Sequence, residues 1–126
     1  MDGITHILIN ENDYKFNNRN YKEITKNIIK QLSLNNSAIG VIWYDKNKIK
    51  PVVWVRDIDS CFYENACGSG SLAYGMFYLL KNKKVDKIDI KQRNNKIITI
   101  KANIINNTIK DTSICGETII GGKIVV

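Results

Sequence analysis

The sequence predicts an α+β fold in which an antiparallel, barrel-like sheet wraps around a central buried helix, with one outer amphipathic helix. Three observations support this prediction. Short apolar runs alternate with polar turns, which is typical of strands. The segment that follows Cys67 as far as Leu80 is apolar on almost every side, as a buried helix requires. The segment Arg19–Leu34 has apolar residues on one face only, which indicates a helix on the surface.

The first part of the chain is expected to contain a strand, the outer helix and a hairpin. Ile4–Ile9 is a short apolar run suited to a strand, and Arg19–Leu34 follows it as the outer helix. Ala38–Tyr44 and Ile49–Val55 are apolar on both sides of a short polar turn, so they are expected to pair as a hairpin. Pro51 has no backbone N–H group, which indicates a strand start or a sheet edge.

The second part is expected to contain the buried helix and then four strands. Small residues keep the early turns of the helix narrow, and large apolar side chains follow them. Pairs of asparagines between the later strands supply turns, because asparagine tolerates a positive φ. The strands expected after the helix are Val85–Lys91, Ile97–Ile105, Thr108–Ile114 and Thr118–Val126, the last bent at its two glycines.

Length and composition predict one domain, residues 1–126, with one hydrophobic core. We expect no membrane association, because no apolar run is long enough to span a bilayer and no leader resembles a signal peptide. The formal charge is +7, but the lysines are spread over the whole chain. This distribution favours solvated lysines, with steering of anionic substrates as a second interpretation, and it argues against a nucleic-acid partner.

The cysteines indicate neither a disulfide framework nor a metal site. Cys61, Cys67 and Cys115 are odd in number and irregular in spacing. A reducing, cytoplasmic compartment is therefore expected. Cys61 and Cys115 lie in strand-like runs and are expected to be core residues or inert thiols.

The segment Glu64–Ser71 carries the clearest chemical signal of the chain. It places Cys67 directly before a Gly-Ser-Gly turn that opens the buried helix. A thiol at a helix N-terminus lies at the positive end of the helix dipole, which favours the thiolate. The free N–H groups of Gly68, Ser69 and Gly70 can hold a carboxylate or a developing oxyanion beside it. The motif therefore predicts chemistry on an acid, and the competing interpretation of Cys67 is a buried structural cysteine.

This motif, preceded by Asp57-Ile58-Asp59-Ser60, and the opening Gly3-Ile4-Thr5-His6 resemble the diaminopimelate epimerase-like superfamily of amino-acid racemases. Within it, the motif most resembles the histidine racemases of staphylopine-type metallophore pathways. The resemblance covers essentially the whole chain but only one of the two halves of the family, the C-terminal half. It implies that each half contributes one cysteine to a site between them. One thiolate removes the Cα proton and the other thiol returns a proton to the opposite face, without pyridoxal phosphate or another cofactor.

The resemblance also implies roles for individual residues. Cys67 would be the proton-transfer cysteine of this half, with the substrate carboxylate bound by Gly68, Ser69 and Gly70. His6 would match a histidine that lines the epimerase site. Either Asp57 or Glu64 would match the acidic residue that lies upstream of the cysteine, and both remain candidates. The other residues expected beside the substrate include Asn65, whose side chain could instead cap the helix.

The departures from the family pattern bear on the substrate and the partner. The epimerases follow their acidic residue with an arginine, where this chain has Ile58 after Asp57 and Asn65 after Glu64. This difference argues against diaminopimelate and leaves histidine or another amino acid. The second cysteine would come from a separate half-domain or from a homodimer partner. A third alternative is a non-catalytic module that binds a small molecule or a protein through the same fold.

Overall fold

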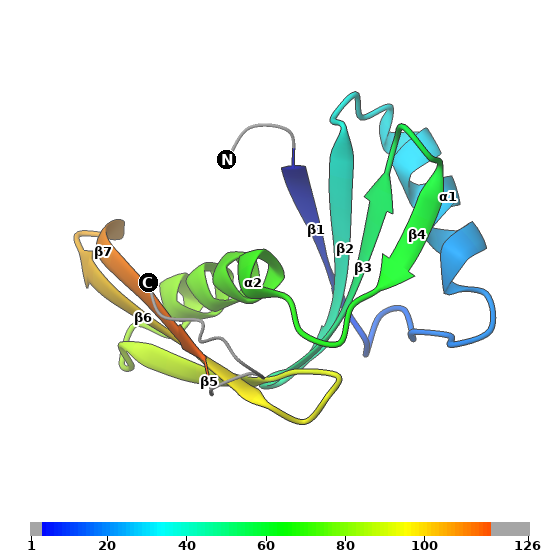
Figure 1. The fold of residues 1–126 in the computed structure, drawn as a ribbon. Coiled ribbons are helices and arrows are strands. Elements are labelled where there is room, and N and C mark those ends of the chain that lie inside the picture. The colour runs from blue at the N-terminus through cyan, green and yellow to red at the C-terminus, as the bar shows by residue number, and fades with distance from the viewer. Residues whose placement is uncertain (1–3, 117–126) are drawn as a thin grey trace.

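The computed structural model describes residues 4–116, in which two helices and seven strands form (Figure 1). Every expected element within this range is present, and the expected strand Thr118–Val126 lies outside the described residues. In chain order the elements are β1 (Ile4–Asn10), α1 (Tyr21–Leu32), β2 (Ala38–Asp45), β3 (Lys48–Val55), β4 (Ser60–Tyr63), α2 (Gly68–Lys81), β5 (Lys87–Lys91), β6 (Ile97–Ile105) and β7 (Thr108–Gly116).

The strands form one curled sheet in the order β1-β2-β3-β5-β6-β7, with β4 also paired to β3. Strand β3 pairs with β4 over Val52–Val55, and it meets β5 only where Lys48 lies opposite Lys91. Because β3 changes partners along its length, the sheet divides into two parts that curve around α2 (Figure 1). The predicted α+β class and the barrel-like sheet around a central helix are confirmed.

The sheet is antiparallel, as expected, except at two places. Strand β1 runs parallel to β2, and the short contact between β3 and β5 is also parallel. Helix α1 lies between β1 and β2 in the chain, and a helical crossover is what allows two consecutive strands to run parallel. The pairing of β1 with β2 brings His6 opposite Gly40.

Helix α2 packs in the hollow of the sheet against β6, β5, β2 and β1. Gly75 allows this close approach, because a Cβ atom at that position would lie 2.7 Å from Cβ of Ile100. One core surrounds the helix and consists of Ile42, Ile49, Tyr74, Leu79, Ile88, Ile90, Ile98, Ile100, Ala102 and Ile114. Leu80 remains exposed, so α2 is buried on most but not all of its circumference.

Helix α1 covers the outer side of β3 and β4 (Figure 1). A second core lies there and consists of Ile29, Ile39, Val41, Trp43, Val52, Trp54 and Cys61. Side chains alternate between the two faces of a strand, so β2 contributes Val41 and Trp43 to this core and Ile42 to the core around α2. This double burial explains why β2 is apolar at nearly every position.

The turns adopt the conformations expected from their asparagines, whereas Pro51 does not lie at the strand start that was one of its two expected positions. Asn95, Asn106 and Asn107 all adopt positive φ, as expected of asparagine turns. Pro51 lies inside β3, opposite Ile42, and not at a strand start. Its carbonyl accepts the Glu64 N–H at 2.9 Å, at the point where β4 ends and the chain turns toward α2.

No helix among residues 4–116 is long and apolar enough to cross a membrane.

Candidate functional site

Cys67 is itself the N-cap of α2. Its backbone is extended, with φ −139° and ψ 106°, and its Sγ accepts a hydrogen bond from the Gly70 N–H at 3.2 Å. Serine, threonine, asparagine and aspartate usually supply the side-chain oxygen at this position. The Gly70 N–H and the positive end of the helix dipole are both directed toward this sulfur. Asn65 does not cap the helix and lies exposed in the preceding loop.

The cap uses one of the three amides that the sequence predicts for carboxylate binding. The Gly70 N–H is engaged by Cys67, whereas those of Gly68 and Ser69 have no hydrogen-bond acceptor within the described part of the chain. They lie in the first turn of α2, where free N–H groups attract anions. Gly70 is enclosed, because a Cβ atom there would lie 3.0 Å from Sγ of Cys67 and 2.8 Å from Cδ1 of Ile42. Two free amides and one sulfur therefore lie at the same helix end.

His6 and Ser69 extend the polar contacts of Cys67 toward β1. The Ser69 Oγ lies 3.6 Å from Cys67 Sγ and 3.3 Å from His6 Nε2. The imidazole of His6 lies over Gly40 of β2, where a Cβ atom would approach its Cδ2 to 2.8 Å. Burial lowers the pKa of His6, so the ring is neutral at pH 7. Three of the predicted residues are thus brought together from β1 and α2.

The two acidic candidates lie on either side of β4. Glu64 is half-buried in the loop between β4 and α2, three residues before Cys67. Asp57 is exposed in the turn between β3 and β4, so the whole of β4 separates it from that loop. The structure therefore brings Glu64 toward the start of α2 and leaves Asp57 at the other end of the strand.

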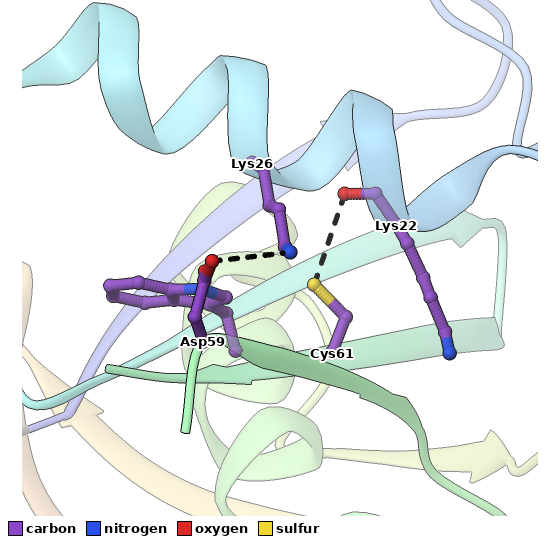
Figure 2. A network of polar contacts seen from close by, with 5 residues as sticks. Lys22, Lys26, Asp59 and Cys61 are labelled. Atoms are coloured by element: carbon purple, nitrogen blue, oxygen red, sulfur yellow. Dashed lines mark hydrogen bonds and ion pairs between the residues drawn. The ribbon is translucent and has the colours of Figure 1, made fainter. Parts of the chain in front are cut away.

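Asp59, in the same turn as Asp57, connects the hairpin to α1 (Figure 2). Its carboxylate accepts a hydrogen bond from Trp54 Nε1 at 2.9 Å and pairs with Lys26 of α1 at 3.5 Å. The hydrogen bond from Trp54 lowers the pKa of Asp59. The contacts of Asp59 hold the turn against α1, on the side of the sheet away from α2.

Gln92, which the sequence analysis did not select, makes direct contact with Cys67. It is fully buried, and its Oε1 accepts the Cys67 N–H at 3.0 Å. Its Nε2 donates to Ser71 Oγ at 2.8 Å and to the Ile90 carbonyl at 3.1 Å. A signal for it does exist in the sequence, because Gln92 continues the inward-facing alternation of Ile88 and Ile90. A polar residue at a core position requires hydrogen-bond partners.

The family comparison agrees with the chemistry of this helix end. The family model described as "Histidine racemase CntK N-terminal domain" matches residues 1–123. The chain belongs to this histidine racemase domain family. Histidine racemases from two strains of Fusobacterium nucleatum subsp. nucleatum, ATCC 23726 and ATCC 25586, are each 36% identical to it over 97 residues. These alignments cover 75% of this chain and 36% of each relative, so the chain spans only about a third of the curated relatives it matches.

The histidine racemase resemblance is therefore confirmed, but the matching family is named for the N-terminal domain. The sequence analysis had placed the chain in the C-terminal half. In the family pattern described above, each half contributes one cysteine. A Cys-Gly-Ser-Gly segment at the start of the central helix is consequently a weak guide to which half a chain represents.

The other two cysteines of the domain lie in different surroundings. Cys61 of β4 is buried against α1, with Sγ 3.8 Å from the Lys22 carbonyl (Figure 2). Burial raises the pKa of the Cys61 thiol. Cys115 of β7 is exposed, and all three cysteines are free thiols. The expectation that Cys115 is an inert thiol remains a prediction.

Cavities elsewhere in the domain do not include this helix end. A cavity of about 640 Å³ lies between the α2–β5 connection and strands β6 and β7, and its lining contains neither Cys67, Ser69 nor His6. The same is true of cavities of about 400 Å³ beside α1 and about 280 Å³ beside the end of α2.

Proposed function

We propose that this domain is one half of a cofactor-independent amino-acid racemase, in which Cys67 exchanges the Cα proton of the substrate. The observation that carries the proposal is the sulfur at the N-cap of α2, beside the amides of Gly68 and Ser69, which have no acceptor among residues 4–116. The relatives that the chain matches are named histidine racemases, which makes histidine the first substrate to test.

The reaction needs an acid and a base on opposite faces of one carbon, together with stabilisation of the carbanion between them. The substrate carboxylate binds the N–H groups of Gly68 and Ser69, which places Cα beside Sγ of Cys67. The Cys67 thiolate takes the Cα proton, and the electron pair left on Cα delocalises into the carboxylate that the two amides stabilise. A thiol of the complementary half gives its proton to the opposite face. One sulfur gains a proton and the other loses one.

His6 and Ser69 can serve both protonation states of Cys67. When His6 carries its proton on Nε2, it donates to Ser69 Oγ, and the Ser69 hydroxyl is then free to donate to the thiolate. In the other tautomer the Ser69 hydroxyl donates to Nε2, and its oxygen accepts the S–H of the thiol. A racemase cysteine must act as a base in one direction and as an acid in the other, which this pair of arrangements supports.

Glu64 is the carboxylate that we assign to the site in preference to Asp57. It lies in the loop that leads into Cys67, whereas Asp57 lies beyond the far end of β4. A carboxylate on this side can pair with the α-ammonium group of an amino acid whose carboxylate binds the helix end. Asn65 lies next to it and would border the same substrate.

The partner is the complementary half-domain, which would supply the second cysteine. A domain named as the N-terminal part of a larger racemase, and about a third of the length of its relatives, supports this assignment over a homodimer. Cys67 itself is 7% exposed, and the complementary half would complete the site beside it.

The test is Cα hydrogen–deuterium exchange of L-histidine in D2O, followed by NMR and chiral analysis. The chain is assayed alone at high concentration and with the complementary half added. We expect exchange with inversion when both halves are present, its loss in Cys67→Ala, and its retention in the exposed-site control Cys115→Ala. Full activity of the chain alone would replace the half-domain partner with a homodimer. Binding of histidine without exchange, in the presence of both halves, would indicate a binding module and overturn the proposal.

A further inference from the structure

We infer that Gln92 is a positioning residue that holds Cys67 in the backbone conformation required at the helix cap. The inference rests on the proposed role of Cys67 and adds a residue to it. Gln92 is 0% exposed and lies 25 residues after Cys67 in the chain, yet its side chain contacts the Cys67 backbone directly. Its three side-chain hydrogen bonds join the end of β5 to the first turn of α2.

The orientation of the Gln92 amide is determined by its partners. The Cys67 N–H is only a donor and therefore requires the oxygen, at 3.0 Å. The Ile90 carbonyl is only an acceptor and therefore requires the nitrogen, at 3.1 Å. A flipped amide would face a donor with a donor and an acceptor with an acceptor. Ser71 Oγ, itself fully buried, takes the second N–H of the amide at 2.8 Å.

All three polar groups of Cys67 are consequently engaged. The N–H is bound by Gln92, the carbonyl accepts the Ser71 N–H at 3.0 Å, and Sγ accepts the Gly70 N–H at 3.2 Å. The Cys67 N–H is the one that connects the residue to a part of the sheet outside its own helix. Glycines at positions 68 and 70 give the following turn little stiffness of its own. The bond to Gln92 therefore limits rotation of Cys67 and keeps Sγ over the Gly70 amide.

The turn that carries Gln92 also holds the loop before Cys67. Arg93 Nη1 donates to the Tyr63 carbonyl at 2.9 Å, and its guanidinium lies 3.8 Å from the centre of the Tyr63 ring. The Asn94 N–H donates to the Asn65 carbonyl at 3.0 Å. Three consecutive residues thus contact the segment Tyr63–Cys67. This arrangement makes Gln92 part of a support for the loop, and not only a filler of the core.

The first experiment measures how alkylation of Cys67 by iodoacetamide depends on pH, with peptide mass spectrometry to separate the three cysteines. In Gln92→Ala we expect the Cys67 rate at pH 7 to fall by about five-fold, the effect of losing one hydrogen bond. Gln92→Glu keeps an acceptor for the Cys67 N–H but loses the donors to Ser71 and Ile90, so we expect a smaller fall in the Cys67 rate than in Gln92→Ala. The control is Gln31→Ala, at the exposed and only other glutamine of the chain.

The rate for Cys115, which is exposed on β7, serves as the reference within each variant. A purely structural role of Gln92 would lower the thermal unfolding midpoint and leave the Cys67 profile of the folded protein unchanged. That result in either Gln92 variant would overturn the inference. A change at Cys67 with none at Cys115 supports it.

A second measurement needs no variant, so it can test the hydrogen bond from Cys67 to Gln92 even if the Gln92 variants do not fold. Amide hydrogen exchange in the unmodified chain should be slow at Cys67 and fast at Gly68 and Ser69, whose N–H groups have no acceptor in the described structure. Equal exchange at all three amides would overturn the inference. Both measurements report on Cys67 without turnover, so they can succeed even if histidine is not a substrate.

Discussion

Two cysteines on opposite sides of the sheet face the first turn of a helix in opposite ways. The Sγ of Cys61 lies 3.8 Å from a carbonyl oxygen of α1, that of Lys22, and can only donate its proton to it (Figure 2). The Sγ of Cys67 lies 3.2 Å from an N–H group of α2, that of Gly70, and accepts from it. A carbonyl stabilises the thiol and an amide stabilises the thiolate.

The difference teaches that proximity to a helix start does not by itself activate a cysteine. Cys67 occupies the N-cap of α2, at the end toward which the first N–H groups of the helix point. Cys61 approaches α1 from the side, within the core that joins this helix to the sheet, and burial raises its pKa. The charged groups next to it, Lys26 and Asp59, pair with each other.

The largest effect expected from this comparison is on catalysis. Cys67→Ser, assayed with the complementary half, should lower Cα exchange of histidine by about 10²- to 10⁴-fold, because a hydroxyl is a far weaker base than a thiolate. The matched variant Cys61→Ser should keep the exchange rate of the folded protein within about two-fold, since it lies on the other side of the sheet. Equal losses in both variants would remove the functional difference between the two cysteines.

A second expected effect is on stability, and it compares how closely the two helices approach the sheet. Helix α2 approaches the sheet through Gly75, whereas α1 has no glycine. In Gly75→Ala the new Cβ would meet Ile100 at 2.7 Å, and the free energy of unfolding should fall by about 1–3 kcal/mol, as measured by urea denaturation.

The control for this prediction is Gly68→Ala on the same helix. Its Cβ would meet only Cδ1 of Ile114, at 3.6 Å, which is an ordinary contact. Here the higher helix propensity of alanine should leave stability unchanged or raise it by up to about 1 kcal/mol. A Gly75→Ala protein as stable as Gly68→Ala would mean that α2 lies farther from the sheet than described.

The smallest expected effect is on the pH dependence of the free energy of unfolding, which differs between the α2 side and the α1 side of the sheet. Burial lowers the pKa of His6 below 6.5, so the unfolded chain binds this proton more readily than the folded one. The free energy of unfolding should therefore decrease as the pH falls below 6.5, and His6→Gln should remove that part of the decrease. Asp59, on the α1 side, has a pKa lowered from 3.8, and its contribution is lost only below that pH.

An NMR titration measures the His6 effect directly, because His6 is the one histidine in the sequence. We expect its midpoint below 6.5. A midpoint at or above 6.5 would mean that the ring is not desolvated beside Ser69, and the neutral ring assigned to the site would be wrong.

Local patterns predicted much of the fold and the central residue of the site. Apolar periodicity identified α1, α2 and every described strand except the short β4, and the Cys-Gly-Ser-Gly order placed Cys67 at the start of α2. The parallel pairing of β1 with β2 was not predicted, because it depends on how α1 connects two strands in space. Gln92 was missed for a similar reason, since its partner Cys67 lies 25 positions away in the chain. The use of Sγ as the helix cap likewise depends on a side-chain rotamer that no residue pattern specifies.

The most direct test of this account compares the alkylation rates of the three cysteines in the folded chain at pH 7. Cys61 and Cys67 are both buried and Cys115 is exposed, so accessibility alone would make Cys115 react fastest. We predict instead that Cys67 reacts fastest, that Cys115 is intermediate, and that Cys61 is slowest. The Gly70 N–H contacts the sulfur of Cys67, whereas Cys115 is surrounded by solvent. Cys61 is expected to be slowest because burial raises its pKa. If Cys67 reacts no faster than Cys115, the start of α2 does not activate its sulfur, and the assignment of Cys67 as the proton-transfer residue is contradicted.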